Sequence, residues 1–247
     1  SAYFQTLSTA LDKAGLARPT LIIDKQKLLA NANVLHQHLA GRYDYRVVAK
    51  SLPSLPLLET VMSHTDTQRL MVFHQPFLNL IAKELPNADV LLGKPMPVAA
   101  AARFYQQHTT TQFDARHQLQ WLVDSPARLI QYADLGRQRR ELMLINLELD
   151  VGLHRGGIKD EEQLAVALDI IEREPFLQFS GFMGYDPHVS KNPGLLGGPE
   201  AAFASVQKTY QNFVTIAERQ LQRSLSGLTL NAAGSPTYQR YTGAQVA

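Results

Sequence analysis

The stretch YRVVAKSLPSLPLLETV (residues 45–61) contains a complete β–α unit and decides the fold. Its apolar run, YRVVAK, lacks strict alternation of polar and apolar residues, which is typical of a parallel strand buried on both faces. A turn rich in Ser and Pro follows, and helical periodicity begins after it. The run ends on Lys50, although lysine normally lies on protein surfaces. The sequence therefore places an amine at the end of a buried strand.

The same β–α pattern recurs along the chain. We expect eight strands, at residues 20–24, 45–50, 69–73, 89–93, 120–124, 142–152, 179–185 and 228–233. Segments with helical periodicity separate them, and no change of composition marks a linker. The pattern predicts one (β/α)8 barrel domain over residues 1–247. The alternative, an open doubly wound sheet, would need a GxGxxG sequence after an early strand, and none occurs.

Composition and charge limit the classes of function. Of the 247 residues, 45% are hydrophobic and 19% are charged, which is ordinary for a globular protein with a sizeable core. The net charge is +2 and the basic residues are scattered, so nucleic-acid binding is not expected. The chain has no cysteine, no visible signal peptide and no apolar stretch of membrane-spanning length. We therefore expect a cytoplasmic protein without a membrane partner.

In a β/α barrel, functional groups lie at the carboxyl ends of the strands. Arg155 follows the sixth expected strand and keeps its charge, so it suits an anionic partner such as a phenolate or carboxylate. Its structural alternative is an ion pair with Glu148 or Asp150. Tyr185 ends the seventh expected strand, where it would stack on a planar ring or belong to the core.

The sequence NAAGSPTY (231–238) follows the eighth expected strand. Loops after strands seven and eight of barrels often bind phosphate through backbone N–H groups at the start of a short helix. The structural alternative is a turn with an N-cap serine. Taken alone, this loop does not decide between the two.

Lys50 decides the interpretation. Beside Arg155 at the mouth of a barrel, its ammonium form would be disfavoured and its pKa lowered, which makes the amine a nucleophile for an aldehyde. A lysine that extends to solvent is the alternative. A nucleophilic lysine, a fixed cation, an aromatic ring and a phosphate-binding loop at one rim together predict a site for pyridoxal 5′-phosphate.

These motifs resemble the barrel domain of fold-type III pyridoxal-phosphate enzymes, the superfamily of alanine racemase, D-threonine aldolase and D-serine dehydratase. The resemblance runs from PTLIID (19–24) to NAAGSPTY. VVAK-S is similar to the family's Schiff-base lysine motif, LELDVGLHRGG (147–157) to its strand-six signature, and GFMGY (181–185) to its ring-stacking position.

The resemblance implies a role for each site residue. Lys50 would form the Schiff base, Arg155 would face the phenolic oxygen with Glu148 behind it, and Tyr185 would stack on the pyridine ring. Lys50 and Tyr185 are the expected catalytic residues. The expected phosphate contacts are Asn231, Gly234, Ser235, Thr237 and Tyr238.

The reaction is less well defined by the motifs, whose form is closer to the D-threonine aldolase and D-serine dehydratase branch. A lyase that cleaves a D-3-hydroxy amino acid is therefore our first expectation. Dehydration of D-serine and racemisation are alternatives, as is a barrel without a cofactor. A non-enzymatic carrier of pyridoxal phosphate is a further alternative, although its GEN-type and HFIG-type stretches are replaced here by VFHQPF and GKPMPV.

The family pattern also includes a C-terminal β domain that supplies a second acid/base group or metal ligands. Few residues follow the last expected strand, so we expect the natural protein to continue beyond Ala247, with a divalent metal bound only in the longer protein. No metal ligand is predicted within this chain, because its eight His form no metal motif. The loop 188–200 is long for a connection, and we expect it to contact that domain or a second subunit of a homodimer.

Overall fold

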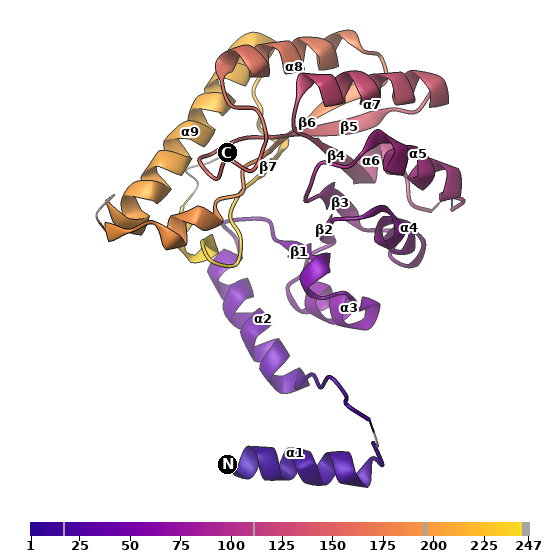
Figure 1. Cartoon of the computed structure of the whole chain (residues 1–247), viewed down its shortest axis with the longest axis vertical. Coiled ribbons are helices and arrows are strands. Elements are labelled where there is room, and N and C mark those ends of the chain that lie inside the picture. Colours follow the sequence, from indigo (N-terminus) through magenta and orange to yellow (C-terminus); the bar gives the residue numbers. More distant parts are fainter. Residues whose placement is uncertain (17, 111, 195–196, 244–247) are drawn as a thin grey trace.

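The computed structural model describes residues 1–16, 18–110, 112–194 and 197–243, and its centre is a curled parallel sheet. Within these residues seven strands pair in chain order, forming a half-barrel (Figure 1). They are β1 (Arg46–Val48), β2 (Arg69–Val72), β3 (Asp89–Leu92), β4 (Leu119–Val123), β5 (Met143–Glu148), β6 (Leu177–Met183) and β7 (Thr229–Asn231). The seven strands expected between residues 45 and 233 are thereby confirmed, and so is the parallel α/β class.

The helices after β1 lie on the outer side of the sheet, whereas the helix that precedes β1 extends away from it (Figure 1). In chain order, these helices are α2 (Lys25–Leu39), α3 (Leu55–His64), α4 (Gln75–Glu84), α5 (Val98–Gln107), α6 (Ala115–Gln118), α7 (Pro126–Arg139), α8 (Glu161–Arg173) and α9 (Gly198–Leu221). Short 3-10 helices follow β1, β6 and β7, at η1 (Ala49–Ser51), η2 (Pro187–Lys191) and η4 (Tyr238–Arg240). Side chains cap the N-termini of several α-helices. Ser125 accepts from the Arg128 N–H, and Asp160 accepts from the Gln163 N–H.

The sheet curls far enough for β4 and β7 to touch across its concave face. Gln120 of β4 donates to the hydroxyl of Thr229 in β7 at 2.8 Å. Asn146 of β5 donates to the Gln120 side chain at 3.2 Å and to the Thr229 carbonyl at 3.3 Å. Gly181 lets β6 approach β7, because a Cβ there would overlap the backbone of Thr229. The concave face is therefore polar at this level, and the hydrophobic core lies between sheet and helices.

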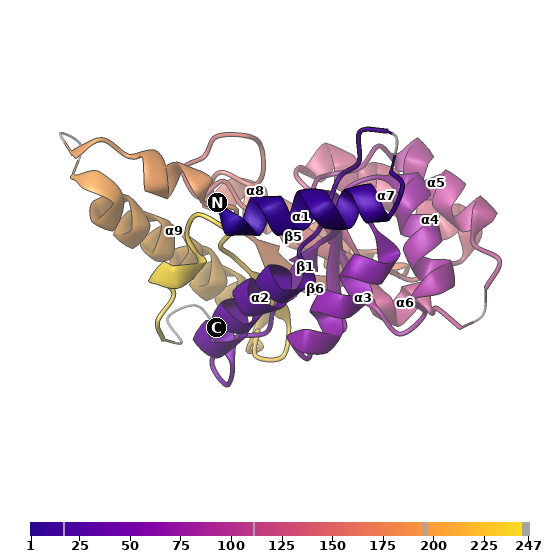
Figure 2. The same ribbon diagram turned by 90° about the horizontal axis from the view of Figure 1, so that it is seen from below.

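The first expected strand, residues 20–24, is not formed. The segment lies between α1 (Ala2–Lys13), a helix without buried residues, and α2. Leu21 is 91% exposed, and the segment lies apart from the sheet in Figure 1; Figure 2 views the molecule from the end where α1 lies. TLIID has the composition of a buried strand, but composition does not supply neighbouring strands. Its last residue, Asp24, caps α2 by accepting from the Lys27 N–H, and it also accepts from the Tyr3 hydroxyl in α1. The end of the segment is therefore held by two helices and not by strands.

Candidate functional site

A continuous series of contacts runs along the carboxyl ends of the strands. Lys50 lies in η1, directly after β1, and its exposed Nζ is 4.2 Å from the centroid of the Phe73 ring, which follows β2. The ring lies against the backbone at the end of β3, since a Cβ on Gly93 would overlap it. The Gly93 carbonyl then accepts from Nη2 of Arg155 at 3.5 Å. An aromatic ring thus connects the lysine to the arginine.

Arg155 connects this series to the last two strands. Its guanidinium carbon lies 4.8 Å from the centroid of the Tyr185 ring, just after β6. The Tyr185 ring fills the space that a Cβ on Gly234 would need, at the start of the loop after β7. The structure therefore brings four predicted residues, Lys50, Arg155, Tyr185 and Gly234, to one rim of the half-barrel.

The loop after β5 folds back on its own strand and places Arg155. The Asp150 carboxylate accepts from the N–H groups of Gly152 and His154, which fixes the first turn. The chain then returns to the strand, where the Ile158 N–H donates to the Glu148 carbonyl at 2.8 Å. Gly157 is required at this return, because its φ is +99° and a Cβ would overlap the Glu148 backbone. Arg155 consequently lies above the end of β5.

Glu148 holds the guanidinium from below. Its Oε1 accepts from Nε of Arg155 at 2.5 Å, and the Glu148 residue is only 3% exposed. Burial raises the pKa of Glu148, while the charge and hydrogen bond of Arg155 act in the opposite direction. The ion pair with Glu148, given above as the structural alternative, is formed. It uses Nε, so Nη1 has no hydrogen-bond partner among the described residues. An Arg oriented in this way presents fixed positive charge at the rim.

The loop after β7 separates the remaining predicted residues. Ser235 is exposed, and no partner of its N–H or hydroxyl is seen in the described part of the chain. Thr237 is fully buried: its hydroxyl donates to Oδ1 of Asp186 at 2.7 Å and accepts from the Gly234 N–H at 3.1 Å. Gly234 and Ser235 therefore form the accessible side of the loop, and Thr237 supports it from inside.

Two further predicted residues, Asn231 and Tyr238, take no part in the rim contacts described above. The Asn231 carbonyl accepts from the Gly184 N–H at 2.9 Å, within the pairing of β6 and β7. Tyr238 faces α2: its carbonyl contacts Nε2 of His38 at 3.2 Å, and its ring packs edge-on against the His38 ring.

Sequence reasoning missed three residues of this site. Phe73 and Gly93 are single residues at strand ends, and no local pattern distinguishes them. Asp186 directly follows Tyr185, the last residue of the quoted stretch GFMGY (181–185), and this position was an available signal. Its carboxylate is fully buried, and only contacts with residues distant in sequence show its part in the loop.

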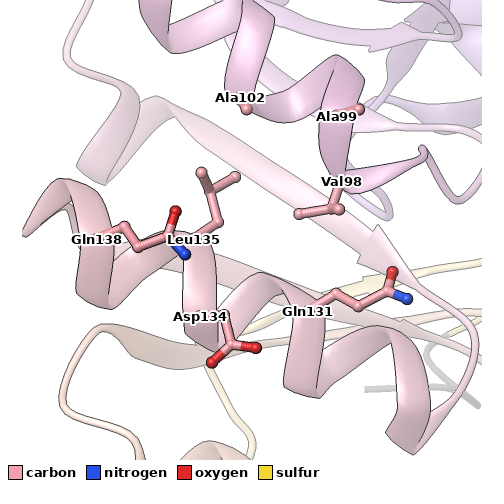
Figure 3. Close-up of a pocket in the computed structure, with 7 residues that line it drawn as sticks. All are labelled: Val98, Ala99, Ala102, Gln131, Asp134, Leu135 and Gln138. Carbon is pink, nitrogen blue, oxygen red and sulfur yellow. The ribbon is translucent and has the colours of Figure 1, made fainter.

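The outer helical layer carries a separate hollow of about 240 Å³, between α5 and α7 (Figure 3). It is lined by Val98, Ala99, Ala102, Gln131, Asp134, Leu135 and Gln138. None of these residues belongs to the rim contacts, so the hollow is not part of the candidate site. In the described ranges we find no group of three or more His, Asp or Glu that could hold a metal ion, and no helix with the length and apolar character of a membrane span.

Comparison with known proteins identifies the family. The chain matches the alanine racemase N-terminal domain over residues 23–247, and it belongs to this family, whose members include pyridoxal-phosphate-dependent enzymes. The resemblance seen in the sequence is therefore confirmed. A comparison with curated proteins gives no match.

Solved structures of several enzymes share the fold. D-threonine aldolase from Filomicrobium marinum has a TM-score of 0.73 at 14% identity, over 89% of this chain and 57% of that protein. D-threo-3-hydroxyaspartate dehydratase from Delftia sp. HT23 has a TM-score of 0.69 at 17% identity, over 91% of this chain and 61% of that protein. Alanine racemase from Clostridium difficile 630 has a TM-score of 0.65 at 12% identity, over 87% of this chain and 52% of that protein. The chain thus spans less than two thirds of each protein's length, and identities this low show the fold alone.

Proposed function

We propose that this domain binds pyridoxal 5′-phosphate, with Lys50 as the residue that attaches it covalently. The observation that carries the proposal is the continuous rim contact from Lys50 through Phe73 and Gly93 to Arg155 and on to Tyr185. It places an exposed primary amine, a fixed cation and an aromatic ring at the strand ends, where barrels carry their chemistry. Membership of the family supports the same assignment.

The residues present fit the chemical parts of this cofactor. The Lys50 amine suits the aldehyde, the Arg155 guanidinium suits the polar edge of the ring, and Tyr185 suits its face. Ser235 offers an exposed N–H and hydroxyl for the phosphate, beside the open backbone of Gly234. When bound, pyridoxal phosphate acts as an electron sink for negative charge that develops at a substrate carbon.

The chain's own residues then divide the remaining work. Lys50 would hold the cofactor through its amine, and Nζ would also be the group that holds or transfers a proton beside it. Arg155 supplies a guanidinium cation, and Glu148 fixes its direction. Tyr185 lies between the guanidinium and Gly234, which orients its ring. Lys50 and Tyr185 are therefore our proposed catalytic residues.

For the reaction, we propose a lyase that acts on D-3-hydroxy amino acids, in the manner of D-threonine aldolase. Two proteins of the same fold carry names with such substrates, D-threonine aldolase and D-threo-3-hydroxyaspartate dehydratase. Dehydration of D-serine is the second candidate, favoured by the dehydratase fold match. The β domain expected beyond residue 247, and a metal bound with it, stay predictions.

We further propose that residues 20–24 complete an eight-stranded barrel by pairing between β7 and β1. In the described residues β1 pairs only with β2 and β7 only with β6, so each has an open edge. Leu21, Ile22 and Ile23 are apolar and exposed, and burial would stabilise the closed form. Because the chain has no cysteine, a set of double variants that each place one cysteine in residues 21–23 and one in residues 46–48 gives a clean cross-linking test of the two segments. Closure predicts a disulfide between the two, and its absence under oxidising conditions argues for the open arrangement.

Two experiments test the cofactor and the reaction. Titration with pyridoxal phosphate should give a visible absorbance band, and Lys50→Ala should abolish it. Lys94 is an exposed lysine just beyond β3, and the control variant Lys94→Ala should retain the band. A band that survives Lys50→Ala refutes the assignment. For the reaction, D-threonine, D-serine and D-alanine are assayed with and without Mn²⁺. Glycine and acetaldehyde from D-threonine identify an aldolase, pyruvate from D-serine a dehydratase, and L-alanine from D-alanine a racemase.

A further inference from the structure

We infer that Asp186 is a positioning residue for the loop that receives the cofactor phosphate. The loop comprises residues 233–238, and Asp186 holds it through the hydroxyl groups of Thr237 and Tyr241. This inference rests on the proposed function, because it concerns the phosphate of pyridoxal phosphate. The contacts that carry it are nevertheless independent of any ligand.

The Asp186 carboxylate reaches the loop through two parallel hydrogen-bonded connections. Oδ1 accepts from the Thr237 hydroxyl at 2.7 Å, and Oδ2 accepts from the Tyr241 hydroxyl at 2.9 Å. The Thr237 hydroxyl in turn accepts from a backbone N–H at the start of the loop, donated by Gly234 at 3.1 Å. One buried carboxylate therefore orients the Gly234 peptide group through Thr237 and also holds Tyr241, just beyond the loop.

The loop backbone shows why such support is needed. Ala233 has a φ of +65°, a left-handed conformation that is unfavourable for a residue with a side chain. Residues in this conformation persist where surrounding contacts determine them. A third contact comes from η2, where the Ser190 hydroxyl donates to the Pro236 carbonyl at 2.8 Å. The segment after β6 thus holds the segment after β7 on both sides of Ser235.

These contacts determine what the loop can offer to a phosphate. The Thr237 hydroxyl and the Gly234 N–H are used within the loop, so the accessible donors are those of Ser235. Tyr185 immediately precedes Asp186 and packs on Gly234, which places the aromatic ring and the loop in fixed relation. Asp186 is thereby connected to both the ring-binding and the phosphate-binding sides of the site.

The burial of Asp186 argues for positioning rather than for stability. The residue is 0% exposed, and both of its side-chain hydrogen bonds come from neutral hydroxyls. A carboxylate buried with neutral partners costs free energy that an apolar residue would not. A buried carboxylate also accepts hydrogen bonds on two oxygens in fixed directions, which a hydroxyl or amide cannot reproduce. Two aimed acceptors are what the two connections require.

The test compares two ligands that differ only in the phosphate. Dissociation constants for pyridoxal phosphate and for pyridoxal are measured by titration of the absorbance band, in the wild type, Tyr241→Phe, Thr237→Val and Asp186→Ala. We expect each variant to bind pyridoxal phosphate about tenfold more weakly, with pyridoxal affinity unchanged within about twofold. Thr237→Ser keeps the hydroxyl and should restore wild-type preference.

A matched control separates positioning from a general loss of packing. Tyr132→Phe removes another buried tyrosine hydroxyl, which donates to the Met96 carbonyl in the helical layer, and it should leave both affinities unchanged. If Asp186→Ala does not fold, Tyr241→Phe carries the test, because it preserves the ring.

Each outcome assigns the failure to one proposal. Equal weakening for both ligands, or no weakening for either, overturns the role of Asp186 while the proposed function stands. A wild type that binds both ligands equally well also overturns it, because the loop then receives no phosphate. A wild type that binds neither ligand refutes the proposed function, and this inference with it.

Discussion

The carboxyl ends of the neighbouring strands β5 and β6, which we call the first and second exits, each carry a buried carboxylate. The partners of the two carboxylates differ. At the end of β5, Glu148 pairs with the guanidinium of Arg155. After β6, Asp186 accepts from the hydroxyls of Thr237 and Tyr241. Burial raises the pKa of both carboxyl groups, yet only Glu148 has a permanent positive charge beside it.

The difference shows two uses of one chemical group at a single rim. Glu148 orients a charge, because the guanidinium that it holds can act directly on an anionic part of a ligand. Asp186 orients backbone, because the Thr237 hydroxyl that it holds accepts in turn from the Gly234 N–H of the loop. Substitutions at the first exit should therefore change stability through an unpaired charge. Substitutions at the second should change the affinity for phosphate.

The largest effect is expected for Glu148→Ala. The Arg155 side chain is only 19% exposed, and removal of its carboxylate leaves a poorly hydrated cation without a partner. We expect the free energy of unfolding to fall by about 3 kcal/mol, as measured by urea denaturation. Glu148→Gln keeps an acceptor for Nε and should lose less. Equal losses in the two variants would show that the charge of Glu148 does not matter.

A smaller effect is expected at the second exit for Ser235→Ala, measured as affinity for pyridoxal phosphate. The side chain is exposed, so its removal should leave the free energy of unfolding within about 0.5 kcal/mol. Loss of one hydrogen bond to a charged phosphate should weaken binding by about 1.5–3 kcal/mol. Ser224→Ala, at an exposed serine beyond α9, is the control and should change neither quantity. An unchanged affinity in Ser235→Ala would place the phosphate elsewhere.

The smallest effect concerns pH and the Asp186 carboxyl group. Burial raises its pKa above the ordinary 3.8, with Thr237 and Tyr241 acting in the opposite direction. The folded state therefore binds this proton more tightly than the unfolded state. The resulting stability is present at low pH and is lost as the pH rises through the raised pKa.

In Asp186→Asn the amide cannot ionise, so this variant does not lose that stability as the pH rises. As the pH rises above the ordinary pKa of 3.8, the difference in unfolding free energy between the two proteins should shift in favour of Asp186→Asn. His188 is a titratable neighbour that lowers the pKa of Asp186. The comparison of Asp186 with Asp186→Asn is therefore repeated in a His188→Gln background. A difference between Asp and Asn that is constant with pH would contradict the direction of the shift.

The sequence predicted the elements that depend on local composition. Seven buried strands followed from short runs of Val, Ile and Leu, and the strand ends then indicated Lys50, Arg155 and Tyr185. The segment 20–24 has the same composition but no strand beside it, and composition alone cannot distinguish these situations. Its final Asp24 also suits a helix cap, which is how the structure uses it.

Contacts between distant residues could not be predicted in this way. Asp186 meets Thr237 and Tyr241, which lie 51 and 55 residues further along the chain. The same holds for the ring of Phe73, which packs against Gly93 and beneath Lys50 only because β2 and β3 are neighbours. Thr237 was expected to contact phosphate directly, and its burial instead gives it a supporting place. Residue type and spacing thus located the rim, whereas packing decided which groups remain accessible.

We propose that the Lys50 amine attaches pyridoxal phosphate at this rim. The most direct measurement incubates the protein with pyridoxal phosphate, fixes the adduct with sodium borohydride and locates the modified peptide by mass spectrometry. We predict one modified lysine, Lys50, with no stoichiometric modification in Lys50→Ala. Modification of Lys94, or of any other lysine in place of Lys50, would contradict the site described above.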